Sequence, residues 1–414
     1  MQSEIINNLG NPGQLEKLYR DDKTTFRKNF NLIYEQIKEN QTAQIWNERL
    51  NYGNDEISWG SKKELIYVLV ISFIAGLIAK IPHFTALNEE YFYPRNIGFI
   101  VFPALMAYFF LKHQLKTQKL WIILPIILVC ALYINLLPDQ PQSDTLILAC
   151  MHLPLILWSV LGFAFTGDHF MNYQKRLDFL RYNGDLIVMT TIILIAGGIL
   201  AGITLGLFSM IDINMEEFYL QNVGVWGLAA APVLGTYLVR TNPHLVNKVS
   251  PVVAKDFTPL VLVTLVVYLI AVIHAGKDPY NDRDFLLIFN LLLIGVMAII
   301  LFAIAETSSG STSNIETSLL FALALVTVIL NCIALSAIVF RISEWGITPN
   351  RLAVLGSNLL ILTHLLVVTF RLFKTLKDGD GKENVEKSIA SFLPVYTIWA
   401  VIVTLFFPLL FGFK

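Results

Sequence analysis

Charge is scarce in this sequence. Of its 414 residues, 15% are Asp, Glu, Lys or Arg, and 55% are hydrophobic. Soluble globular domains average about 25% charged residues, so this composition favours a membrane protein and excludes a disordered or coiled-coil chain. The 30 basic and 31 acidic residues leave a formal net charge of −1, which gives no electrostatic bias toward nucleic acid. We therefore expect no nucleic-acid partner.

Cysteine is also rare, and the common motifs for cofactors and catalysis are missing. The three thiols, Cys130, Cys150 and Cys332, all fall within apolar runs and cannot form a disulfide framework. Cys150 and His152 carry soft ligand atoms, but residues this close in sequence do not share one face of a helix. The sequence contains no phosphate-binding glycine loop, His-Glu-x-x-His or Gly-x-Ser-x-Gly motif. We predict no metal site, no cofactor and no catalytic residue.

Long apolar runs are the dominant feature of the chain. A helix needs about 20 mostly apolar residues to cross a bilayer, and backbone groups in lipid must be satisfied internally, which favours helices. Eleven runs qualify: residues 64–82, 96–112, 119–137, 145–165, 186–211, 217–239, 257–275, 285–305, 317–340, 351–373 and 391–412. The sequence predicts an all-α integral membrane protein in which residues 64–414 form a bundle of about 11 transmembrane helices in the lipid bilayer.

Lys and Arg concentrate in alternate loops. Residues 1–63 hold nine of them, and the loops on the same side hold most of the rest. The opposite loops hold only Arg95, Lys277, Arg283, Arg341, Arg351 and Lys414. By the positive-inside rule, we expect a cytoplasmic N-terminus and an external C-terminus. Because the first apolar run starts only after these polar residues, we expect no cleaved signal peptide.

Residues 1–63 form the only sizeable polar segment. Asn11, Pro12 and Gln14 make a helix start, and apolar residues from Leu15 to Ile37 recur at helical spacing. We predict a cytoplasmic amphipathic helical segment that is too small for a large core of its own. It either docks on the cytoplasmic loops or the membrane surface, or it serves as a regulatory module for a protein partner.

Small residues recur at every fourth position in two consecutive apolar runs. They are Gly198, Gly202 and Gly206 in the fifth run, and Gly227, Ala231 and Gly235 in the sixth. In lipid, small residues allow two helix backbones to approach closely. The pattern predicts either a tightly packed helical hairpin at the centre of the bundle or a dimer interface that uses the same glycines.

Charged residues on the predicted outer face suggest a binding site. Arg341, Glu344 and Arg351 lie within one short loop around Trp345, and Gly346 there permits a positive φ. Arg95 and Lys80 fall on the same side. These residues are either an interfacial belt with local salt bridges, or a ligand-binding pocket for an anionic group. In the second case we expect Arg341, Glu344 and Arg351 to form a single hydrogen-bonded cluster.

Four stretches of the sequence resemble a known family. They are residues 90–99 (EYFYPRNIGF), 240–245 (RTNPHL), 280–283 (YNDR) and 343–351 (SEWGITPNR). Through them the chain resembles a bacterial family of polytopic membrane proteins catalogued as domain of unknown function 4153. The resemblance implies a protein of the bacterial inner membrane with no assigned activity, substrate or cofactor.

Three functions remain open. A transporter or permease would use the outer-face pocket, although no carboxylate lies near the centre of any predicted span. A non-enzymatic scaffold or sensor subunit would use residues 1–63 and the basic inner loops to engage a protein or anionic lipid. An enzyme acting on a lipid-linked substrate would need a general acid such as Glu344, Glu89 or Glu90. Enzyme activity is the least favoured of the three, and the sequence defines neither a substrate nor an oligomeric state.

Overall fold

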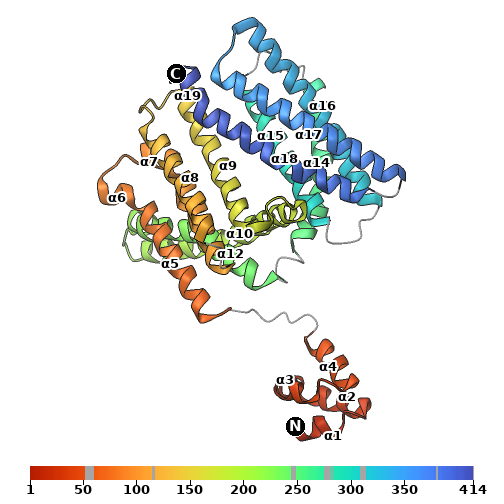
Figure 1. The fold of residues 1–414 in the computed structure, drawn as a ribbon. Coiled ribbons are helices and arrows are strands. Elements are labelled where there is room, and N and C mark those ends of the chain that lie inside the picture. Colours follow the sequence, from red (N-terminus) through yellow and green to blue (C-terminus); the bar gives the residue numbers. More distant parts are fainter. Residues whose placement is uncertain are drawn as a thin grey trace. The chain divides into compact units, whose positions relative to one another are not determined.

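The computed structural model of the protein is built from helices (Figure 1). It describes residues 1–51, 60–113, 117–243, 249–274, 280, 283–307, 314–378 and 381–413, and these residues contain no strand. The chain divides into two compact units, Met1–Ser58 and Trp59–Lys414. The sequence had placed this boundary at residue 63.

The first unit is a four-helix miniature domain with a core of its own. Its helices are α1 (Gln2–Asn7), α2 (Pro12–Asp21), α3 (Lys23–Ile37) and α4 (Gln41–Asn51). Phe26, Phe30 and Trp46 are buried at its centre with apolar residues from all four helices. The expected amphipathic segment therefore has a small core, in which its apolar stripe packs against α1 and α4.

Local capping explains where the helices of this unit begin. The Asn11 side chain accepts a hydrogen bond from the Gln14 amide at 3.2 Å, as the sequence predicts. Asp22 is extended, with φ −150°, and its carboxylate accepts from the Thr25 amide at 3.0 Å. Asp22 thus ends one helix and caps the next. The apolar stripe from Leu15 to Ile37 is divided between α2 and α3.

The second unit is an all-α membrane bundle. Its helices are α5 (Lys62–Ala79), α6 (Ile81–Thr85), α7 (Glu89–Lys112), α8 (Thr117–Leu136), α9 (Asp144–Thr166), α10 (Tyr173–Ser209), α11 (Glu216–Tyr219), α12 (Val225–Thr241), α14 (Val249–His274), α15 (Arg283–Thr307), α16 (Asn314–Trp345), α17 (Pro349–Asp378), α18 (Lys382–Val401) and α19 (Phe407–Leu410). A 3₁₀ turn, η1 (Gly167–His169), follows α9, and π-helical turns η2 (Leu220–Gly224) and η3 (Ile402–Phe406) precede α12 and α19.

Each of the eleven apolar runs coincides with helix in the described residues. Nine described helical segments are long and apolar enough to cross a membrane. The first run falls short of that standard because α5 opens with Lys62, Lys63 and Glu64. In the seventh, the described apolar helix is the shorter stretch Phe257–Ala271. The all-α membrane fold is confirmed, while the count of about 11 and the orientation stay predictions.

Two apolar cores meet along the first half of α10. One core joins α5, α7, α9 and α12 and includes Phe179 and Tyr182 of α10. The other joins α14 to α18 and includes Leu177 and Leu180 of α10. Because these residues alternate between two faces of one helix, the start of α10 lies between the two groups of helices.

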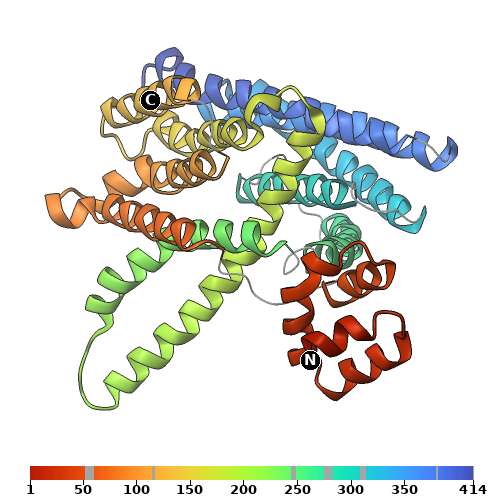
Figure 2. The ribbon, with the colours of Figure 1, turned by 60° about the horizontal axis from the view of Figure 1, so that its bottom comes forward.

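The glycine pattern does not make a tightly packed hairpin at the centre of the bundle. Within the described residues, a Cβ added at Gly198, Gly202, Gly206 or Gly227 would meet no atom within 4 Å. Figure 2 shows the far portion of α10 extending away from the other helices of this unit, while the start of α12 packs on α5 through Trp226. In the described residues, α10 and α12 approach each other at the inner end of the hairpin, where Ala231 is buried and Gly235 approaches Thr190. The prediction is wrong for the first four positions, and a dimer interface there stays a prediction.

The helix ends form two groups, one at each end of the bundle, as expected for helices that run in alternating directions. At one end of the bundle, Arg176 at the start of α10 donates to the Ala390 carbonyl of α18 at 3.1 Å. At the other end, the Tyr91 hydroxyl at the start of α7 donates to the Asn135 carbonyl near the end of α8 at 2.9 Å. The first group contains the ends predicted to be cytoplasmic, which we call the inner ends. The second group contains the outer ends.

Candidate anion-binding site

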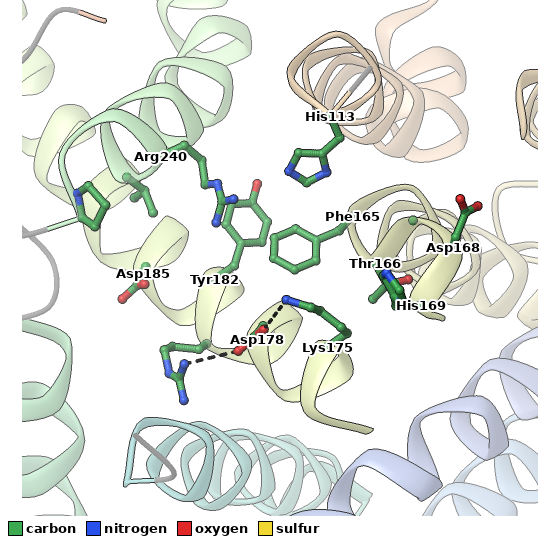
Figure 3. Close-up of a pocket in the computed structure, with 14 residues that line it drawn as sticks. His113, Phe165, Thr166, Asp168, His169, Lys175, Asp178, Tyr182, Asp185 and Arg240 are labelled. Atoms are coloured by element: carbon green, nitrogen blue, oxygen red, sulfur yellow. Dashed lines mark hydrogen bonds and ion pairs between the residues drawn. The ribbon is translucent and has the colours of Figure 1, made fainter. Parts of the chain in front are cut away.

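A pocket of about 470 Å³ opens where the inner ends of α7, α9, α10 and α12 meet. We call it the Arg240 pocket. Its lining comprises His113, Phe165, Thr166, Gly167, Asp168, His169, Lys175, Asp178, Arg181, Tyr182, Asp185, Val239, Arg240 and Pro243. Figure 3 shows these side chains, with Phe165 and Tyr182 lying between His113 and Arg240. The site therefore combines an aromatic wall with several charged groups.

The aromatic wall is rigid. The rings of Phe165 and Tyr182 stack at 5.1 Å, and Phe109 packs edge-on against both, at 5.0 and 5.1 Å. The Tyr182 hydroxyl lies 2.8 Å from the hydroxyl of Thr236 on α12, which fixes the ring. Buried aromatic pairs of this kind hold their geometry well. The wall thus gives the pocket a fixed shape.

Arg240 is the central cation of the pocket. Its guanidinium carbon lies 5.6 Å from the Phe165 ring centre and 5.9 Å from that of Phe109. Its Nε is buried, and within the described residues it has no hydrogen-bond partner. No carboxylate of the described chain forms an ion pair with Arg240 either. Stacking holds this charge in place but leaves its hydrogen-bonding capacity unused.

The other charges of the pocket are largely paired with one another. Lys175 Nζ and Arg181 Nη1 lie 3.2 and 3.4 Å from the two carboxylate oxygens of Asp178. Arg181 also donates to the Ala305 carbonyl at 2.8 Å, and its Nε lies 3.8 Å from Glu306. Asp168 is paired with Lys119 at 3.0 Å. These contacts place Arg240 apart from the neighbouring salt-bridge network.

His113, just after α7, is held neutral. Its burial lowers its pKa below the usual 6.5, and the nearby charges of Arg240, Lys112 and Lys175 lower it further. Its ring packs at 5.5 Å from Phe109 and 6.3 Å from Phe165. A negative charge in the pocket would reverse this balance, because it would stabilise the imidazolium form. The protonation of His113 would therefore respond to an anion bound in the pocket, whose lining also carries the carboxylates of Asp168, Asp178 and Asp185.

The predicted outer cluster is not formed. Among the described residues, no hydrogen bond or ion pair joins Arg341, Glu344 and Arg351, so this prediction is wrong. Arg351 instead donates to the carbonyls of Trp345 and Gly346 at 2.8 and 2.7 Å, at the end of α16. Both Arg side chains approach the Trp345 ring, at 5.2 and 5.7 Å, and Glu344 is exposed. Gly346 has the expected positive φ, +77°.

The other two predicted outer residues also make structural contacts. Arg95 is 3% exposed, stacks on Tyr91 at 3.9 Å, and contacts the Pro138 carbonyl and the Asp139 carboxylate at 3.3 and 3.4 Å. Lys80 is equally buried and donates to the Gln221 carbonyl at 3.0 Å. Arg95 and Lys80 thus hold different pairs of helix ends together, and neither shares a contact with the Arg351 loop. A ligand-binding role for these residues stays a prediction.

The sequence reasoning missed the Arg240 pocket. Arg240, Lys175 and Arg181 counted only as evidence for the positive-inside rule. The available signal was that basic residues or His stand at the inner ends of consecutive helices, where antiparallel packing brings them together. Arg240 also opens the RTNPHL stretch quoted for the family resemblance.

No group of three or more His, Cys, Asp or Glu side chains suited to a metal ion occurs in the described parts of the chain. Cys130 is buried and Cys332 is exposed, and both are free thiols, as is Cys150. The geometry gives no basis for choosing a metal.

Comparisons with known proteins give no further guide to the site. A scan against protein-family models, a search of curated proteins and a search of solved structures each found no match.

Proposed function

We propose that this multi-pass membrane protein binds a phosphate-class anionic group in the Arg240 pocket, at the cytoplasmic face of a bacterial inner membrane. In this proposal it acts as a non-enzymatic sensor or scaffold subunit, with Met1–Ser58 available to a protein partner. Membership of the family catalogued as domain of unknown function 4153 is part of the same proposal. That family assigns no activity that would conflict with it.

The observation that carries the proposal is the state of Arg240. Its guanidinium faces a 470 Å³ pocket, stacked on Phe165. No carboxylate in the described residues pairs with it. A partly buried charge without a counter-ion is unfavourable, and a planar guanidinium matches phosphate oxygens through two parallel hydrogen bonds. Lys175, at the rim, adds a second donor.

The pocket also has the right place for such a ligand. It lies at helix ends that the positive-inside rule assigns to the cytoplasm, where lipid phosphates and soluble phosphorylated molecules are both accessible. Phosphate on a lipid headgroup and free phosphate share the chemistry that Arg240 would recognise. The experiment below separates these two sources.

The test is the thermal unfolding of the purified full-length protein with inorganic phosphate or with anionic lipid. In detergent, phosphate is compared with chloride at equal ionic strength. In nanodiscs, phosphatidylcholine is compared with a mixture containing phosphatidylglycerol. A ligand at 100 times its Kd stabilises the folded state by about 2.7 kcal/mol. Stabilisation by phosphate alone identifies a soluble ligand, and stabilisation by anionic lipid alone identifies a headgroup.

The matched variants are Arg240→Gln and Lys374→Gln. Lys374 is exposed on α17 and does not line the pocket. Lys374→Gln therefore changes the net charge by the same amount as Arg240→Gln but leaves the pocket unaltered. We expect Arg240→Gln to lose the ligand-induced stabilisation and Lys374→Gln to keep it. If neither ligand stabilises the unmodified protein, or if both variants respond as it does, the proposal fails.

Transport is the second candidate function, and one observation favours it. The core of α15 to α18 contains fully buried polar side chains, among them Asn331 and His364, well inside predicted spans. Polar groups at such positions often mark solute pathways. In a transporter, the Arg240 pocket would be the inner entrance or exit rather than a sensing site.

A further inference from the structure

Two polar side chains in the core of the second helix group have unused hydrogen-bonding atoms. Asn331 of α16 is 0% exposed, and neither its amide nitrogen nor its amide oxygen has a hydrogen-bond partner within the described residues. His364 of α17 is also 0% exposed, and its Nε2 lacks a partner in the same part of the chain. Neither residue belongs to the Arg240 pocket.

The two residues lie at the same depth. Helices α16 and α17 are joined by a short loop and share the most extensive helix contact of this unit, so they run antiparallel. Asn331 and His364 each stand about four helical turns from that loop. Their sequence neighbours Leu330 and Leu365 belong to one core cluster.

The orientation of the His364 ring is fixed. The ring stacks face to face on Phe392 of α18, with centres 4.2 Å apart and planes 4° from parallel. Its Nδ1 lies 2.8 Å from the hydroxyl of Tyr396 on the same helix. Because the two ring nitrogens lie on different edges, Nε2 is directed away from Tyr396. A group that binds Nε2 must therefore come from elsewhere in the core.

Another pair of polar side chains in this helix group shows how such groups usually obtain a hydrogen-bond partner. Asn358 of α17, which is buried, donates to the partly buried Asn290 of α15 at 2.8 Å, so a hydrogen bond joins these two amides. Asn331 has no such partner in the described chain, although an amide left dry in an apolar interior is strongly unfavourable. The hydroxyl of Thr327, one turn away and also 0% exposed, donates to the Leu323 carbonyl and can still accept.

We propose that internal water binds between Asn331 and His364, forming a buried hydration site in the middle of the α16–α17–α18 group. A buried water usually makes about three hydrogen bonds. The Asn331 amide offers a donor and an acceptor, and His364 Nε2 and Thr327 Oγ1 complete the set. This site would continue the hydrogen-bonded pair of His364 and Tyr396, giving the core a hydrated polar centre of the kind that a transport pathway requires.

Radiolytic hydroxyl labelling of the full-length protein in nanodiscs tests the proposal. Hydroxyl radicals formed from bound water modify side chains beside that water, even when bulk solvent does not reach them. We expect His364, which is 0% exposed, to be labelled severalfold faster than Phe289, which is 1% exposed in the core cluster of α14 to α18. This comparison uses the unmodified protein and does not depend on the folding of any variant.

Two variants complete the test. Asn331→Leu removes the central ligand of the water, and we expect labelling of His364 to fall to the rate of Phe289. Ser357→Ala removes a hydroxyl on α17, the helix of His364, that accepts from Trp399 at 3.0 Å, and it should leave the labelling unchanged. Labelling of His364 at the rate of Phe289 in the unmodified protein, or unchanged labelling in Asn331→Leu, would overturn the proposal.

Discussion

Arg95 and Arg240 are identical side chains with different sets of contacts. Both guanidinium groups stack on aromatic rings near the ends of spanning helices. Arg95 also contacts two carbonyls and the Asp139 carboxylate. In the described residues, Arg240 makes no comparable contact. Buried charges persist when they are paired. The fold accordingly accounts for Arg95, whereas the proposed anion would supply the missing partner of Arg240.

The neutral state of His113 gives the pocket a predictable pH dependence. Burial and the charges of Arg240, Lys112 and Lys175 lower its pKa in the free protein. A bound anion favours the protonated form, so binding raises the pKa and takes up a proton. Affinity must then rise as the pH falls through the pKa of the bound state. Each unit of pKa difference corresponds to a tenfold change in affinity, about 1.4 kcal/mol.

We therefore predict that sulfate, whose charge is constant in this range, binds more tightly at pH 6 than at pH 8. Titration calorimetry at several pH values measures the effect. His113→Asn should remove most of the pH dependence, while His169→Asn, at the rim of the same pocket, should retain it. Equal sulfate affinity at both pH values would show that His113 does not sense the bound anion.

At the outer end of α16, Arg351 and Glu344 should differ sharply in their contribution to stability. Arg351 satisfies two carbonyls at the helix end, and a hydrogen bond to a charged group contributes about 1.5–3 kcal/mol. Arg351→Ala should therefore lower the free energy of unfolding by an amount in that range. Glu344 is exposed, and Glu344→Ala should change it by less than about 0.5 kcal/mol. Denaturant titration measures the free energy of unfolding of each variant. Comparable losses in the two variants would contradict this prediction and support the three-residue cluster that the sequence predicts.

Among the helices, α10 combines two contrasting halves. Its first half carries Leu177, Phe179, Leu180 and Tyr182, which bury into two different cores. Its second half carries Gly198, Gly202 and Gly206, where an added Cβ would meet no atom of the described residues within 4 Å. A helix of 37 residues is longer than the roughly 20 needed to cross a bilayer. The first half can therefore serve the pocket while the second half lies among lipids.

Glycine substitutions measure this contrast directly. A Cβ at Gly356 of α17 would overlap the ring of Trp399, whose indole is held by Ser357. Overpacking of this kind costs about 1–3 kcal/mol, so Gly356→Ala should lower the thermal unfolding temperature. Gly202→Ala meets nothing within 4 Å and should leave it unchanged. A marked loss in Gly202→Ala would show that the hairpin packs as the sequence predicted.

The helices themselves could be predicted, but many of their contacts could not. A long apolar run specifies a spanning helix through local composition alone, and all eleven runs coincide with helix. Which faces touch depends on residues far apart in sequence. The glycines of α10 and α12 have the spacing of a packing motif, yet that spacing does not identify a neighbour. The break at Asp22 was missed because the apolar spacing continues across it.

For the molecule as a whole, the sequence drew attention to the outer end of the bundle, whereas the Arg240 pocket lies at the inner end. The outer loop around Trp345 was a candidate because charged residues are scarce in the chain as a whole and are concentrated in this loop. Arg240, Lys175 and His113 lie far apart in sequence and meet only through antiparallel packing of α7, α10 and α12. Their basic character was also fully accounted for by the positive-inside rule. The pocket therefore required the tertiary structure.

The predicted orientation places the Arg240 pocket in the cytoplasm. Fusions to alkaline phosphatase, which folds only outside the cytoplasm, test it. We expect a fusion at residue 414 to be active and a fusion within residues 244–248 to be inactive. A fluorescent protein at the same two positions should give the opposite pattern. An active phosphatase fused within residues 244–248 would put Arg240 outside the cell and contradict the proposed access of the ligand from the cytoplasm.

The most direct test of an occupied Arg240 pocket is native mass spectrometry of the full-length protein, purified gently from its own membrane. The account predicts that the unmodified protein and Lys374→Gln retain a phosphate-containing lipid or small molecule in a one-to-one ratio. Arg240→Gln should appear without it. Retention of the same mass by Arg240→Gln, or no bound anion in the unmodified protein, would contradict the central claim.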